Sequence, residues 1–128
     1  MPQDSFKLLD WLREFWRSLD PGSDFAEPSA SVLDEWRTEF RWRGLPLTFD
    51  RRRKLVLRGG RVLVGSADIK SVDVEHVCWD NERPEYWKVR LSTGMFSGVE
   101  IGTTHNDVEA SIAAARVATI AGVKVRSL

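Results

Sequence analysis

The sequence predicts an α+β domain, mainly β, in which seven short strands precede one C-terminal helix and follow an N-terminal amphipathic helix. Three patterns predict this class. Apolar residues recur every three or four positions in residues 4–19, alternate with polar ones through residues 36–101, and return to helical spacing in residues 106–121. A chain of 128 residues suits one domain that is long enough to bury a core.

The first predicted helix, in residues 1–20, has a charged face opposite an apolar one. The apolar face includes Leu8, Trp11, Leu12, Phe15, Trp16 and Leu19. Exposing it would forgo about 1.5–3 kcal/mol per side chain, so we expect it to dock on its own domain, a second copy or another protein. A membrane surface fits less well, because the charged face mixes both signs. Residues 21–35 contain Pro, Gly and Ser typical of a linker, which leaves residues 36–128 as the main domain.

Alternation predicts the seven strands. Trp36, Thr38, Phe40 and Trp42 share one face of the first strand, and Gly59-Gly60 signals a hairpin before the fourth. In the fifth strand we expect His76 and Cys78 to be buried, whereas Asp73 and Glu75 suit a solvent face. The expected strands are residues 36–42, 45–49, 55–57, 62–64, 69–79, 87–91 and 96–101.

The last helix has start and stop signals. Thr104 with Asp107, or Asn106 with Glu109, would form a capping pair, and Gly122 fits the stop. Its predicted core face is mostly small, which would let the backbone approach a sheet closely: Ala110, Ala113, Ala114, Val117, Ile120 and Ala121. Val108 and Ile112 lie on a different face, which indicates a second contact.

Composition narrows the function classes. Nineteen basic and nineteen acidic residues give a formal net charge of zero, so no overall field favours nucleic acid or anionic lipid. One cysteine indicates a reducing compartment, and with two histidines it argues against a four-ligand zinc site. No apolar run reaches the roughly 20 residues that span a bilayer, and no signal peptide is evident, so we expect a cytoplasmic protein. The sequence contains no nucleophile, phosphate-loop or metal-binding motif, so we expect no enzyme activity, no cofactor and no metal.

Several short segments carry a family resemblance, which covers about residues 36–125. These are Leu47-Thr48-Phe49-Asp50, Gly59-Gly60-Arg61, Ala67-Asp68-Ile69-Lys70-Ser71-Val72, the segment from Trp87 to Leu91, and Glu109-Ala110 with Ala113, Val117 and Ala121-Gly122-Val123. Together they resemble bacterial pleckstrin-homology-like (PH-like) domains of unassigned function. The resemblance implies a bent seven-stranded sheet or barrel closed at one end by the helix. Members that bind phosphoinositides carry a lysine before the basic pair of the first hairpin; here Arg41 and Arg43 lack it.

The strongest local charge is the basic turn, defined as Arg51, Arg52, Arg53 and Lys54, with Arg58 nearby in sequence. Arginine offers forked donors that match phosphate oxygens, but the same charges also protect a strand edge. We therefore predict a non-catalytic domain for protein interaction or assembly, bound to another protein or to itself. The alternative is a phosphate- or anionic-lipid-binding module that uses the basic turn and Arg58. No specific nucleic acid is expected, since the aromatics lie mostly opposite the charged faces.

Overall fold

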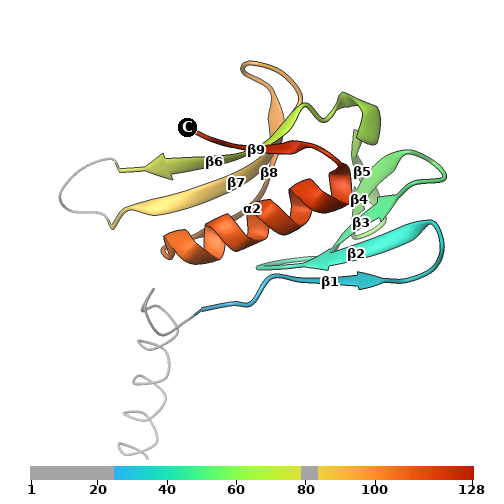
Figure 1. Ribbon diagram of the computed structural model, residues 1–128, viewed down its shortest axis with the longest axis horizontal. Helices are drawn as coiled ribbons and strands as arrows, with labels where there is room; N and C mark the ends of the chain where they lie inside the picture. Colours follow the sequence, from blue (N-terminus) through green and yellow to red (C-terminus); the bar gives the residue numbers. More distant parts are fainter. Residues whose placement is uncertain (1–24, 79–83) are drawn as a thin grey trace, which may run out of the picture.

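The computed structural model describes residues 25–78 and 84–128, which form two sheets and one long helix (Figure 1). The first sheet is an antiparallel meander in the order β1-β2-β3-β4-β5, and the second has the order β8-β7-β6-β9, with β9 parallel to β6. The first sheet contains β1 (Ser29–Val32), β2 (Arg37–Arg41), β3 (Leu47–Asp50), β4 (Leu55–Arg58) and β5 (Arg61–Gly65). The short helix η1 (Ser66–Asp68) leads to β6 (Ser71–Val77), β7 (Tyr86–Ser92), β8 (Gly98–Thr104), α2 (Asp107–Ala121) and β9 (Lys124–Ser127).

Helix α2 packs against the second sheet and also contacts β1 of the first (Figure 1). Its small side chains permit this, because alanine lets the helix backbone lie close to the strands. The core therefore joins both sheets to the helix. Its buried members are Phe40, Trp42, Leu47, Phe49, Val56, Ile69, Val72, Val89, Leu91, Ile101, Ala110, Ala113, Ala114, Val117 and Ala118.

The ends of α2 agree with the sequence signals. Asn106 is the N-cap, and its side chain accepts a hydrogen bond of 3.1 Å from the Glu109 N–H. Gly122 ends the helix in a left-handed conformation with φ of 72°, and its N–H bonds the Ala118 carbonyl. The capping box is half formed, because the Asn106 N–H bonds Thr104 Oγ1 instead of the Glu109 side chain. Glu109 is thereby available for other contacts.

The prediction of a seven-stranded barrel was wrong. All seven expected strands form, but the described residues contain nine strands in two sheets, with β1 and β9 in addition. β1 lies in the segment predicted as linker, and β9 follows the last helix. Neither has a strong local strand signal, since β1 is Ser-Ala-Ser-Val and β9 is Lys-Val-Arg-Ser, with one large apolar residue each. Pairing with β2 and β6, respectively, makes them strands.

Two expectations about β6 were also wrong. Asp73 is 1% exposed instead of solvent-facing, because Arg126 of the unforeseen strand β9 lies across from it and donates hydrogen bonds of 2.8 and 3.2 Å to its carboxylate. His76 and Cys78 are exposed, because His76 is the second-last residue of β6 and Cys78 follows the strand. His76 instead stacks on Trp87 with ring centroids 4.7 Å apart.

The predicted N-terminal helix and its apolar face, from Leu8 to Leu19, lie outside the described residues. Among residues 25–78 and 84–128, no helix has both the length and the apolar character that a bilayer crossing requires.

Candidate anion-binding site

The first turn of α2 carries a carboxylate that is completely buried. Glu109 is 0% exposed, and each of its oxygens accepts at least two hydrogen bonds. Oε1 accepts from the Ala26 N–H at 2.7 Å and from Arg43 Nη2 at 2.9 Å. Oε2 accepts from Arg43 Nε at 2.6 Å and from Trp42 Nε1 at 3.0 Å. This Glu109 cluster, formed by Ala26, Trp42, Arg43 and Glu109, ties two distant segments to the start of the helix.

Electrostatics keep Glu109 ionised. Burial by itself would raise its pKa, but the hydrogen bonds from Arg43, the Ala26 N–H, Thr104 and Trp42 outweigh burial and hold the pKa below its usual value. The position favours the charge as well, because the first turn of a helix carries a partial positive charge. Glu109 is therefore a fixed anion that fixes Arg43 in turn.

The β2–β3 connection is shaped to deliver Arg43 to this carboxylate. Trp42 is buried and packs against Gly102 of β8, where an added Cβ would come within 2.5 Å of the indole ring. Arg43 then takes a left-handed backbone conformation with φ of 36°, which is uncommon for a residue with a side chain. Gly44 follows with φ of 115° and completes the reversal. Trp42 thus anchors the connection, and Arg43 bends it toward α2.

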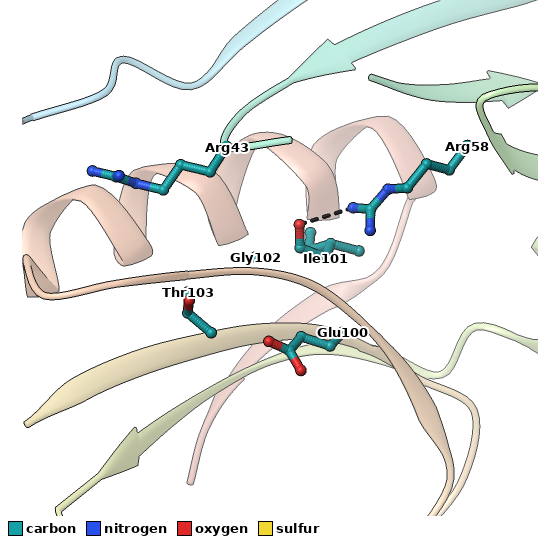
Figure 2. A pocket seen from close by; sticks show the side chains of 6 residues that line it. All are labelled: Arg43, Arg58, Glu100, Ile101, Gly102 and Thr103. Atoms are coloured by element: carbon teal, nitrogen blue, oxygen red, sulfur yellow. Dashed lines mark hydrogen bonds between the residues drawn. The ribbon is translucent and has the colours of Figure 1, made fainter. Parts of the chain in front are cut away.

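Beside this cluster lies an open hollow of about 580 Å³. The Arg58 hollow, as we name it, is lined by Arg43, Arg58, Glu100, Ile101, Gly102 and Thr103. Figure 2 shows the guanidinium of Arg43 pointing away from Arg58, whereas Arg58 reaches toward β8 and bonds the Ile101 carbonyl through Nη2 at 2.9 Å. A register shift between β7 and β8 occurs beside Ile101, between the pairs Val89–Gly102 and Arg90–Glu100. Such irregularities re-aim neighbouring groups, and here Ile101 presents its carbonyl to Arg58.

The charge of Arg58 is not offset by a contacting carboxylate within the part of the chain that the structure describes. Its Nη2 is held by a neutral carbonyl, and its Nε is buried without a hydrogen-bond partner in that same part. Arg43, in contrast, is neutralised by Glu109. Glu100 lines the hollow but forms no ion pair with Arg58 (Figure 2). The hollow therefore offers a held guanidinium to a ligand, which is the chemistry that recognises phosphate or carboxylate.

The structure separates the basic turn from Arg58. The turn joins β3 to β4, with Asp50 opposite Leu55, whereas Arg58 lies at the far end of β4 opposite Leu47. Three residues of strand place it roughly 10 Å from the turn. Arg58 thus belongs with Arg43, from which it is 15 positions away in sequence.

Within the basic turn, two arginines serve local structure. Arg51 donates to the Glu35 carbonyl, and its own N–H bonds the Trp36 carbonyl at 2.8 Å. Arg53 lies 3.6 Å from the carboxylate of Asp50, which also accepts its N–H at 3.0 Å. Arg52 and Arg53 border a smaller hollow of about 340 Å³ whose lining includes Asp34 and Asp50. Two carboxylates make that hollow less suited to an anion than the Arg58 hollow.

Sequence reasoning missed Arg43 and Glu109 as partners. Arg43 was noted as part of a hairpin, and Glu109 was assigned a capping role in α2, which hid its tertiary one. A usable signal was present, because Glu109 follows a helical start and shares the buried side of the helix with Ala110 and Ala113. A carboxylate on a buried face requires a cationic partner from elsewhere in the chain.

Comparisons with protein-family models, with curated proteins and with solved structures find no match for this chain. Among the described residues, no group of three or more His, Cys, Asp or Glu side chains is placed to hold a metal ion.

Proposed function

We propose that this chain is a non-catalytic interaction domain whose ligand presents a phosphate or carboxylate group to the Arg58 hollow. The observation that carries the proposal is the position of Arg58, a guanidinium held by a carbonyl at the wall of an open hollow with no contacting carboxylate among the described residues. Arg43 adds a rigid wall, because Glu109 fixes its guanidinium. Thr103 adds a hydroxyl at the rim.

A PH-like core is part of the same proposal. Its support is the order of the elements: β2 to β5 lie in one sheet, β6 to β8 in the next, and α2 follows at once. On this view β1 and β9 are additions to a core of four and three strands. The predicted assembly role of the apolar face from Leu8 to Leu19 stays a separate prediction.

Inorganic phosphate is the probe for the hollow. We would titrate it into ¹⁵N-labelled full-length protein at constant ionic strength, with chloride as the reference anion, and follow the backbone amide signals of Gly102 and Thr103. Binding should shift both signals with one dissociation constant. Arg58→Gln should weaken it about tenfold or more, because each hydrogen bond to a charged group contributes about 1.5–3 kcal/mol.

The matched control is Arg61→Gln. Arg61 lies opposite Arg58 in the β4–β5 pair, so the variant removes the same charge from the same hairpin without touching the hollow. A second variant, Glu100→Gln, should strengthen phosphate binding by removing a nearby negative charge. Equal weakening by Arg58→Gln and Arg61→Gln would mean that phosphate senses net charge alone, and the proposed site would be abandoned.

A further inference from the structure

Within residues 25–78 and 84–128, the first sheet ends at β1 in an open edge. β1 pairs with β2 on one side and with no other described strand on the other. Natural edge strands are usually guarded by charges, proline or bulges, because their open N–H and C=O groups can pair with another chain. β9 carries Lys124 and Arg126, β8 carries Glu100 and a register shift, and β5 carries Arg61. β1 has the sequence Ser-Ala-Ser-Val and pairs with β2 without a bulge, so it lacks all three.

An apolar groove lies between β1 and α2. It has a volume of about 360 Å³ and is lined by Ala30 of β1 and by Ala115, Arg116, Thr119 and Ile120 of α2. Arg116 is fixed at its border, because its Nη1 donates to the Pro28 carbonyl at 2.6 Å. Ala30 faces α2, so Val32, two residues along the strand, projects on the same side. Val32 is 78% exposed.

The edge therefore carries both a groove and a protruding side chain that fits it. We propose that β1 pairs with β1 of a second copy of this chain, antiparallel and centred on Ser31. In this register each Val32 lies opposite Ala30 of the other copy and covers its groove. Both contacts are made twice by the same surface, which is the condition for a closed twofold dimer. The two five-stranded sheets would then form one continuous sheet.

Charge does not oppose this pairing strongly. Glu27 and Asp34 flank β1, but each is already in an ion pair within its own copy. Glu27 contacts Arg116 at 3.1 Å, and Asp34 contacts Arg37 at 2.8 Å. All four residues of β1 are uncharged.

The test measures the mass of the full chain by light scattering from about 10 μM to about 1 mM, a range that captures a weak dimer. We expect a monomer–dimer equilibrium, and Val32→Lys should raise its dissociation constant about tenfold, since lysine at an edge opposes pairing and the groove loses its valine. The control is Val62→Lys. Val62 is 50% exposed on β5, the other edge of the same sheet. The control variant therefore replaces an exposed valine by lysine at an edge where no pairing is proposed.

A cross-link fixes the register. In a Cys78→Ser background, Ser31→Cys places two thiols face to face at the twofold axis, at a distance that a disulfide spans. Mild oxidation should give a covalent dimer with this variant and none with Val62→Cys. Circular dichroism of each variant checks that the fold is kept.

Two results would overturn the proposal. If the chain is a monomer at every concentration, β1 does not pair with a second copy, and an extended segment of another protein becomes the candidate partner. If the chain is a dimer that Val32→Lys does not weaken, self-association uses another surface. The inference is independent of the anion site. Arg58→Gln should leave the solution mass unchanged, and Val32→Lys should leave the phosphate titration unchanged.

Discussion

Arginines lie at both ends of the paired strands β3 and β4, but their side chains are held differently at the two ends. At the basic turn, consecutive arginines form exposed local contacts, with Arg51 on a neighbouring carbonyl and Arg53 near Asp50. At the other end, Arg43 is held by a fully buried glutamate and Arg58 by a carbonyl of the second sheet. The comparison teaches that density of charge along the chain does not make a binding site. Fixed geometry does, and it comes from burial and from partners distant in sequence.

The largest expected effect is the loss of the buried carboxylate. Glu109→Ala should lower the free energy of unfolding by about 3–5 kcal/mol, because it leaves the guanidinium of Arg43 and the N–H of Trp42 without their acceptor. Chemical denaturation measures this. Glu100→Ala is the control, an exposed glutamate in the same hollow, and should cost less than about 0.5 kcal/mol. Similar losses of unfolding free energy in the two variants would mean that the Glu109 cluster does not stabilise the β2–β3 connection against α2.

The packing of Trp42 on Gly102 comes next. Gly102→Ala would place a Cβ 2.5 Å from the ring, so the indole must move and the domain should lose about 1–3 kcal/mol. The neighbouring exposed residue supplies the control, and Thr103→Ala should cost less than about 1 kcal/mol. Denaturant midpoints compare the two, and in Gly102→Ala the amide signal of Gly44 should move as the β2–β3 connection shifts. An unchanged midpoint in Gly102→Ala would show that the ring has room to yield.

Acid should lower the free energy of unfolding through the protonation of Glu109. Its folded pKa lies below its unfolded value, so its ionic contribution to stability is complete above about pH 4.3 and is lost as the pH falls through the folded pKa. Asp73 acts in the same direction, because hydrogen bonds from Arg126 and Ser71 outweigh its burial and lower its pKa. Urea unfolding between about pH 7 and pH 2 should show a steeper fall for the natural chain than for Glu109→Gln. Parallel curves would contradict the assignment.

The smallest expected effect is at the basic turn. A variant with Arg51, Arg52 and Arg53 all changed to Gln should keep the phosphate affinity of the Arg58 hollow and change stability by no more than about 0.5 kcal/mol per site. The same phosphate titration compares it with Arg58→Gln. If the turn variant loses phosphate binding and Arg58→Gln keeps it, the anion site is the basic turn and not the Arg58 hollow.

The sequence by itself determined the elements with strong local signals. Alternation located β2 to β8, and the Asn106 cap, the alanine face and Gly122 located α2, because strand period, capping and left-handed glycine are local properties of the chain. Tertiary structure decided the rest. β1 and β9 are strands because they pair with β2 and β6, respectively. Asp73 is buried because Arg126 of β9 covers it. Arg43 reaches Glu109, and Arg58 reaches the Ile101 carbonyl, because chain reversal brings together residues that no spacing rule connects.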